Sequence, residues 1–138
     1  MRSVYRLDFP TRHIYPERSQ GITVEVLLRS GSNEFRISAK VDTGSEFCVF
    51  SRDIADALEI DLESGYLQKM STMMGSFDTY GHELTYSVLG HEFSGVLYFA
   101  VDKALLTRNV LGRRGWLERL KVGIVEYDRH LLISDYNT

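Results

Sequence analysis

Apolar and polar residues alternate along two neighbouring stretches in the first third of the chain. Ile22–Leu28 and Phe35–Val41 each place every second residue on an apolar face, which is the pattern of a half-buried β-strand. Between them, Arg29–Glu34 is rich in Gly, Ser and Asn and predicts a turn. The second strand is therefore expected to end next to Asp42.

Further along the chain, most apolar segments also have the character of short strands. In one exception, Ile54 and Leu58 are four residues apart and Ser51 stands at an N-cap position, which predicts a short helix. Arg113–Leu120 predicts one or two further helical turns. Strands are expected at 65–70, 82–90, 92–101, 121–127 and 130–134, the last two joined by a tight turn at Asp128-Arg129. Seven or eight short strands and two small helices predict an all-β barrel or sandwich.

Composition narrows the class of protein further. With 138 residues, 43% of them hydrophobic, the chain is expected to form one globular domain at 21–138. Residues 1–20 hold both prolines and predict an irregular arm, either an edge strand at an interface or a pro-segment. A net charge of −3 gives no reason to expect nucleic acid or a membrane as partner. A single cysteine, Cys48, and a charged first segment indicate a cytoplasmic protein.

The first candidate for chemistry is Asp42, which lies between an apolar strand and a Thr43-Gly44 turn. In an arbitrary protein, this tripeptide can be no more than a structural Asx-turn. A catalytic reading requires a second acid. Two carboxylates about 3 Å apart share one proton, so that one accepts a proton from water while the other donates to a carbonyl.

Three segments together resemble the aspartic proteases of the retropepsin, or retroviral, type. Val41–Ser51 resembles their active-site segment, in which Asp-Thr-Gly follows an apolar strand. Arg108–Leu117 resembles the segment that crosses beneath this loop, and Lys69–Glu83 resembles a short flap hairpin over the substrate. The order and spacing fit from about residue 21 to the C-terminus.

The resemblance implies a closed retropepsin-like barrel with one or two short helices that works as a C2 homodimer. It implies an aspartic endopeptidase without metal or cofactor, acting on an extended peptide or protein. The chain has only one Asp-Thr-Gly, so Asp42 of a second copy must supply the other acid. Thr43 and Gly44 are expected to support the acids, and Ser45 to donate a hydrogen bond to the outer carboxylate oxygen. The expected substrate-binding residues are Ser45, Glu46, Met73, Met74, Gly75, Ser76, Phe77, Val110, Leu111 and Gly112.

Two finer expectations concern the downstream segment. Val110-Leu111-Gly112 is expected to pass under the active-site loop, with glycine at 112 because a side chain would strike the substrate-facing wall. Retropepsins commonly carry an acid four residues after the catalytic Asp and an Arg after the downstream Gly. In this chain these places hold Glu46 and Arg113, so we expect an ion pair between them, the alternative being two surface charges that never meet.

Other interpretations of the sequence remain open at this stage. A non-catalytic dimeric peptide-binding module on the same fold is the main alternative, since a fold does not establish function. His82-Glu83 and His91-Glu92 do not form a His-Glu-x-x-His metal motif and are interpreted as solvated strand ends. Cys48 is interpreted as a buried structural thiol rather than a nucleophile.

Overall fold

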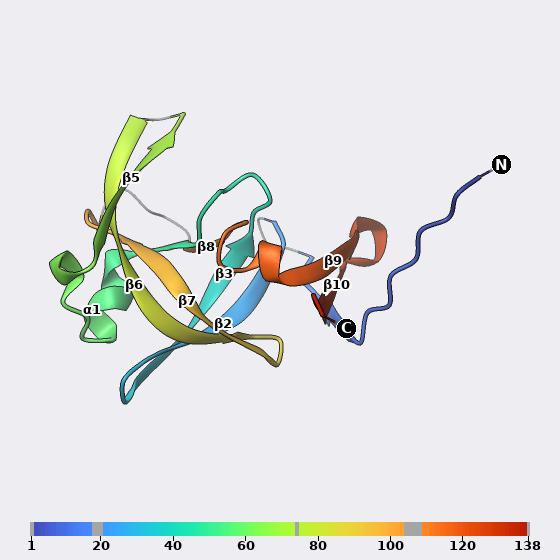
Figure 1. The fold of residues 1–138 in the computed structure, drawn as a ribbon, viewed down its shortest axis with the longest axis horizontal. Helices are drawn as coiled ribbons and strands as arrows, with labels where there is room; N and C mark the ends of the chain where they lie inside the picture. Colours follow the sequence, from blue (N-terminus) through green and yellow to red (C-terminus); the bar gives the residue numbers. More distant parts are fainter. Residues whose placement is uncertain (1, 18–20, 74, 104–108, 138) are drawn as a thin grey trace.

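The chain folds around a closed ring of β-strands. The computed structural model describes residues 2–17, 21–73, 75–103 and 109–137. Six strands follow one another around the ring in the order β2, β3, β8, β4, β7 and β6, and β6 pairs back onto β2 (Figure 1). Their bounds are β2 Thr23–Ser30, β3 Asn33–Val41, β4 Val49–Phe50, β6 Gly75–Val88, β7 His91–Ala100 and β8 Asn109–Leu111. The prediction of an all-β closed barrel is confirmed.

Four strands, β3, β8, β4 and β7, meet where the predicted active-site segment leaves and re-enters the ring. β3 runs parallel to β8, with Val41 opposite Leu111, and β4 runs parallel to β7. β8 also pairs with β4 through Val49 and Val110, in antiparallel orientation. Residues 42–48, which we call the active-site loop, therefore leave the sheet at β3 and return to it at β4, and β8 lies between these two strands.

A long hairpin projects from the barrel at the upper left of Figure 1. It consists of β5 (Tyr66–Thr72) and the first half of β6, paired from Tyr66–Gly81 to Thr72–Gly75. β6 continues without a break into the barrel, where it pairs with β7 and β2. The sequence predicted a hairpin and a separate strand here. In the structure, the second strand of the hairpin and that separate strand are one continuous 14-residue strand, β6.

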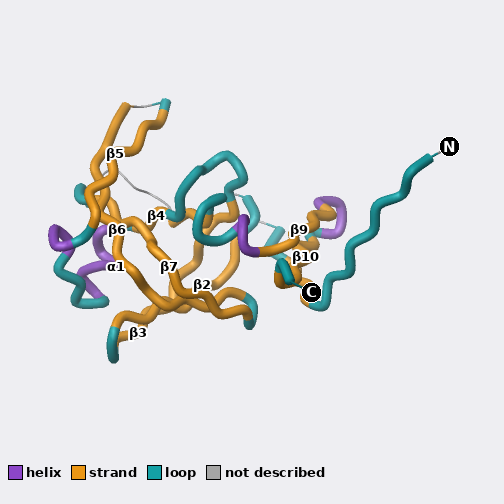
Figure 2. The backbone as a smooth tube through the Cα atoms, viewed as in Figure 1, coloured by secondary structure: helices purple, strands orange, loops and turns teal. Residues whose placement is uncertain are grey.

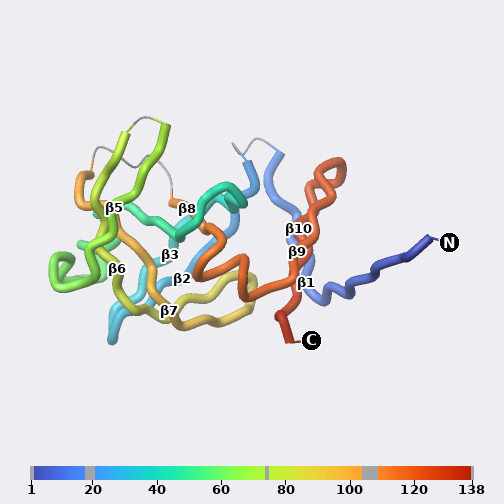
Figure 3. The backbone as a smooth tube through the Cα atoms, turned by 45° about the horizontal axis from the view of Figure 1, so that its top comes forward, coloured from blue at the N-terminus to red at the C-terminus, as the bar shows by residue number. Residues whose placement is uncertain are grey.

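A second, three-stranded sheet lies beside the barrel, in the order β1, β10, β9. Its strands are β1 Thr11–Ile14, β9 Leu120–Val125 and β10 His130–Asp135. His91 at the start of β7 links this terminal sheet to the barrel, since its ring nitrogens lie 2.7 Å from Asp135 Oδ1 and 3.1 Å from Thr11 Oγ1. Figure 3 shows the terminal sheet at the end of the molecule opposite the β5–β6 hairpin.

Helices are few and short, as Figure 2 shows in purple. The predicted helix is confirmed as α1 (Arg52–Ala57), with Ser51 at the N-cap position but without a side-chain capping bond. The predicted turns after Arg113 become the 3-10 helix Leu117–Arg119, and a further 3-10 turn, Glu126–Asp128, joins β9 to β10. In the described part of the chain, no helix is long and apolar enough to cross a membrane.

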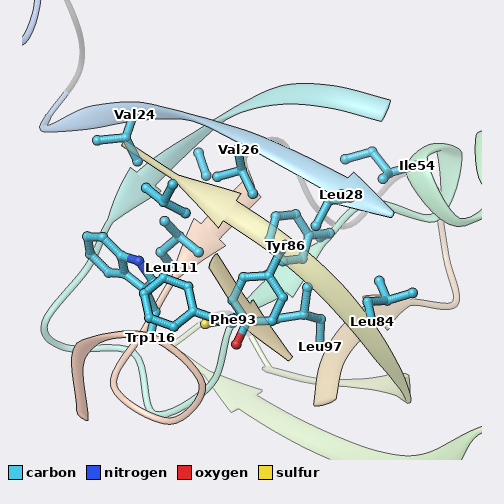
Figure 4. Packing of buried hydrophobic residues seen from close by; sticks show 14 of the residues in the cluster. Val24, Val26, Leu28, Ile54, Leu84, Tyr86, Phe93, Leu97, Leu111 and Trp116 are labelled. Atoms are coloured by element: carbon cyan, nitrogen blue, oxygen red, sulfur yellow. The ribbon is translucent and has the colours of Figure 1, made fainter. Parts of the chain in front are cut away.

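The barrel interior is filled by large apolar side chains from every strand of the ring. Figure 4 shows Leu111 and Trp116 packed among them, and both are fully buried. Tyr86 joins β6 to the segment after β8, because its hydroxyl donates to the Gly115 carbonyl oxygen. Burial raises the pKa of Tyr86 to about 12, so the phenol stays protonated and keeps donating this bond. The core thus holds residues 109–116 firmly against the barrel.

Candidate active site

Asp42 lies at the first position of the active-site loop, directly after β3. Its backbone N–H donates to the Leu111 carbonyl oxygen at 3.0 Å, which fixes the residue to β8. The Gly44 N–H donates to Asp42 Oδ1 at 2.9 Å, and the Ser45 N–H donates to the Asp42 carbonyl oxygen. The side chain is half-buried, so one face of the carboxylate is held by the loop and the other is open to solvent. Within this chain, the Gly44 N–H therefore supports the Asp42 carboxylate.

Residues 109–115, which we call the crossing segment, run beneath the active-site loop. The Arg113 N–H donates to the Ser45 carbonyl oxygen at 2.9 Å, and the Arg114 N–H donates to the Glu46 carbonyl oxygen at 2.7 Å. An isolated parallel bridge joins Phe47 to Arg114. The predicted passage of 110–112 under the loop is confirmed, and it is a set of main-chain bonds that holds the two segments together.

Gly112 is required at the point of closest approach between these segments. A Cβ at this position would lie 2.3 Å from the Phe47 carbonyl oxygen and 2.6 Å from that of Ser45. Both atoms belong to the backbone, which cannot move away without breaking the loop. The expected reason for the glycine was wrong: a side chain would strike the underside of the active-site loop rather than a substrate-facing wall.

A groove of about 570 Å³ separates the active-site loop from the β5–β6 hairpin. Asp42 lies on one wall, with apolar side chains on either side of it and polar ones along β5. The lining residues are Asp42, Gly44, Ser45, Glu46, Phe47, Val49, Gln68, Lys69, Met70, Ser71, Thr72, Phe77 and Val110. A carboxylate in a groove that is bordered by a β-hairpin suits an extended polypeptide, which can add main-chain hydrogen bonds along the hairpin.

The groove contains some of the expected substrate-binding residues and excludes others. Ser45, Glu46, Phe77 and Val110 line it together with Asp42. Leu111 does not, because its side chain is fully buried in the core. Alternation along β8 explains the difference: Val110 and Leu111 point to opposite faces of the strand.

The turn of the β5–β6 hairpin also departs from the expectation. Met73 is fully exposed at the turn, and Gly75 and Ser76 are exposed beside it. None of the three lines the groove of this single chain. Met74 lies outside the described residues.

Seven lining residues were not among the expected substrate-binding residues, although four of them, Lys69–Thr72, lie in the segment that resembles a flap. The seven are Phe47, Val49, Gln68, Lys69, Met70, Ser71 and Thr72. Most belong to β5, the strand that precedes the hairpin turn. Met70 pairs directly with Phe77, a residue that was expected to bind substrate. Residues opposite each other in a hairpin share one face, so Met70 faces the groove together with Phe77.

The two hydroxyl groups of the motif behave differently from what was expected. Ser45 Oγ donates to the Phe47 carbonyl oxygen at 2.7 Å rather than to Asp42. The Ser45 hydroxyl therefore stabilises the loop and does not support the Asp42 carboxylate. The Thr43 side chain is exposed, and within the described residues of this chain its hydroxyl makes no hydrogen bond. Its expected contact with a pair of acids would need the second copy.

The ion pair of Glu46 forms with the neighbouring arginine. Arg114 Nε lies 3.0 Å from Glu46 Oε1, whereas the sequence predicted Arg113 in this place. The parallel bridge between Phe47 and Arg114 brings Arg114 alongside the loop, next to Glu46. About 64% of the Arg114 side chain and 57% of the Glu46 side chain are exposed, so the pair is a surface one.

This exposure predicts a small effect of breaking the pair. We expect Arg114→Ala to lower the free energy of unfolding by less than about 1 kcal/mol, because water replaces most of the lost attraction. Chemical denaturation of the variant, with Arg113→Ala as the matched control, measures the difference. A loss of more than about 2 kcal/mol specific to Arg114 would show that the Glu46 charge is left without solvent, as in a buried pair.

Cys48 lies behind the loop, with no exposed surface. Its thiol donates to the Arg114 carbonyl oxygen and accepts from the Gly112 N–H, at 3.4 and 3.3 Å. Burial raises the pKa of the Cys48 thiol to about 11, so it stays protonated at neutral pH. The thiol therefore joins the loop to the crossing segment, in agreement with the structural interpretation.

Comparison with known proteins gives matches at the level of sequence family and of structure. Residues 22–115 match the family described as aspartyl protease. The fold is similar to that of a retropepsin-like aspartic protease from Rickettsia conorii, with a TM-score of 0.67 and 23% identity over 90% of this chain and 97% of that chain. It is also similar to EIAV protease complexed with the inhibitor HBY-793, with a TM-score of 0.55 and 17% identity over 72% of this chain and 88% of that chain. No curated protein matches the sequence.

Proposed function

We propose, from the premise that the chain belongs to the aspartyl protease family, that it is an aspartic endopeptidase which acts as a homodimer. Each copy contributes Asp42 to one shared site, and an extended polypeptide is the substrate. The observation that carries the proposal is the half-buried Asp42, whose carboxylate accepts a hydrogen bond from the Gly44 N–H and lines the groove beneath the β5–β6 hairpin. The second acid must come from another copy, because the chain holds a single Asp-Thr-Gly.

In the proposed mechanism, the two Asp42 side chains share one proton and hold a water molecule between them. The ionised carboxylate accepts a proton from the water, whose oxygen attacks the carbonyl carbon of the scissile peptide. The protonated carboxylate donates its proton to the carbonyl oxygen. Collapse of the resulting tetrahedral diol then breaks the C–N bond, and the leaving amine takes up a proton from the acid pair.

The β5–β6 hairpin is proposed to act as a flap over the bound peptide. Its two strands present Met70 of β5 and Phe77 of β6 towards the groove as a directly opposed pair. An unbranched methionine adapts to side chains of different shape. Closure of this hairpin would exclude water from the acids and hold the peptide as an added strand.

Because Cys48 is buried and unpaired, the protein needs no oxidising compartment, in keeping with a cytoplasmic location.

Dependence of activity on protein concentration tests the shared site. We expect cleavage per subunit of a fluorogenic peptide library to rise with concentration until the dimer saturates, because one copy holds only half of the acid pair. Sedimentation over the same range gives the fraction of dimer. Constant activity per subunit down to concentrations at which only monomer sediments would refute the shared site. Binding of peptides without cleavage at any pH would instead support a peptide-binding module.

A further inference from the structure

Exposed apolar side chains gather at one end of the molecule. Among the described residues, eight of the twelve large exposed hydrophobic residues belong to the segment before β1, to the terminal sheet or to the residue that follows it. They are Val4, Tyr5, Leu7, Ile14, Ile124, Val125, Tyr127 and Tyr136. A concentration of this kind on a small protein marks an interaction surface rather than scattered surface residues.

The first part of this surface is residues 2–9, which we call the arm. The arm forms no strand, and Figures 1 and 3 both show it running away from the body of the molecule. Tyr5, Leu7 and Phe9 occupy alternate positions, so in an extended chain they share one face. Phe9 lies against Gly123 of β9, with its ring 3.1 Å from where a Cβ would stand. Tyr5 and Leu7, which are 91% and 57% exposed, continue this apolar face into solvent.

The second part is the end of the β9–β10 hairpin, residues 124–128, which we call the hairpin end. All five residues are exposed, and three of them, Ile124, Val125 and Tyr127, are large and apolar. The other two are acids, Glu126 and Asp128. The arm carries the opposite charge next to its apolar stripe, at Arg2 and Arg6, with Asp8 as its one acid. The two surfaces are therefore complementary in both hydrophobicity and charge.

We propose that the arm of one copy docks on the hairpin end of a second copy, with Tyr5 and Leu7 against its apolar side chains and Arg6 beside its acids. The choice of a second copy as the partner rests on the proposed function, whose site is incomplete in one chain. Phe9 fixes the root of the arm on β9. Four residues span at most about 14 Å, so Tyr5 must land close to the terminal sheet and at the end opposite the β5–β6 hairpin.

Twofold symmetry makes this contact reciprocal. Each copy offers one arm and one hairpin end, so a C2 dimer forms the contact twice. The terminal sheet also has free edges, because within the described residues neither β1 nor β9 pairs with a further strand on its outer side. An extended arm that lies along such an edge can add main-chain hydrogen bonds to the apolar contact. The arm thereby stabilises the dimer in which the two copies of Asp42 meet.

Sedimentation of the full chain over a concentration series tests the proposal without reference to peptidase activity. We expect the double variant Tyr5→Ser/Leu7→Ser to raise the dissociation constant of the dimer by about 10-fold or more, the effect of removing an anchor worth over 1 kcal/mol. The matched control is Tyr66→Ser/Leu67→Ser, the same residue types at 69% and 63% exposure on β5. The control should leave the dissociation constant within about twofold of the wild type.

A charge exchange identifies the surface that receives the arm. Arg6→Glu should weaken the dimer, and Arg6→Glu combined with Asp128→Arg should restore at least part of the loss, because opposite charges again face each other. Equal dissociation constants for the wild type and Tyr5→Ser/Leu7→Ser would overturn the proposal, as would a chain that is monomeric at every concentration. If the double variant Arg6→Glu/Asp128→Arg weakens the dimer by the sum of the two single effects, the hairpin end is not the surface that receives the arm.

The outcome separates this proposal from the proposed function. A dimer that weakens as expected but cleaves no peptide even at saturation would support the arm contact and refute the endopeptidase. A chain that cleaves peptide as a dimer, with a dissociation constant insensitive to Tyr5 and Leu7, would support the endopeptidase and refute the arm contact.

Discussion

Asp42→Asn is expected to abolish peptide hydrolysis and to leave the fold and the dimer intact. The amide has nearly the shape of the carboxylate, and its oxygen can still accept the Gly44 N–H bond, which is 2.9 Å long in the wild type. It cannot take a proton from water, so both halves of the acid pair are lost in the variant homodimer. We expect the rate to fall by about 10⁴-fold, the upper range for general acid–base catalysis.

Initial rates with a fluorogenic peptide measure this loss, and circular dichroism and sedimentation check the fold and the dimer. Asp78→Asn is a suitable control, because Asp78 is an exposed partner of Lys69 on the β5–β6 hairpin and does not line the groove. Cleavage by Asp42→Asn above a trace would place the chemistry at other residues.

Gly112→Val is expected to be among the most destabilising single changes in the chain. The new Cβ would stand 2.3 and 2.6 Å from two carbonyl oxygens of the active-site loop, far inside van der Waals contact. The loop must move, and the main-chain bonds from Arg113 and Arg114 that hold it would be strained or lost. We expect a loss of about 3 kcal/mol in the free energy of unfolding, the upper end for overpacking, and a fall in Tm of about 10 °C.

Thermal unfolding followed by circular dichroism measures this effect. Gly31→Asn is the matched control, because Gly31 has open space around it and its φ of +59° is one that asparagine tolerates. Similar stability of the two variants would mean that the crossing segment does not lie against the loop at residue 112.

The arrangement around Asp42 could be predicted because its signals are short. The strand pattern that ends at Val41 and the tight Asp42-Thr43-Gly44 turn each depend on a few adjacent residues, and the resemblance to retropepsins implied that Val110-Leu111-Gly112 passes beneath them. The structure places all three together through the Asp42 N–H bond to Leu111.

The details that failed depend on which face a side chain takes in three dimensions. Leu111 is buried while Val110 lines the groove, and Arg114 rather than Arg113 reaches Glu46. In both cases the segment was placed correctly and one residue was not. Within β8, a shift of one position reverses the face, and beyond it the isolated bridge at Phe47 selects Arg114 as the partner of Glu46. Ser45 bonds to its own loop, a local competition that the motif alone does not reveal.

Other features could not be derived because they arise from contacts distant in sequence. β1 is a strand only because β10, more than 100 residues later, pairs with it. β6 is one long strand because β5, β7 and β2 support successive parts of it. The groove gains five lining residues from β5 for the same reason, since the hairpin folds towards the loop. Local pattern predicts that such strands exist but not which partners they choose.

The most direct test of the central claim, that two copies of Asp42 form one site, is a subunit-mixing experiment. Wild-type protein at a fixed concentration above dimer saturation is mixed with increasing amounts of Asp42→Asn, and peptide cleavage is measured after exchange. If mixed dimers are inactive, activity should fall in proportion to the wild-type fraction, to about one half at equal amounts, because random pairing leaves fewer wild-type dimers. Activity that stays constant as the variant is added, while sedimentation confirms that subunits exchange, would contradict the shared site.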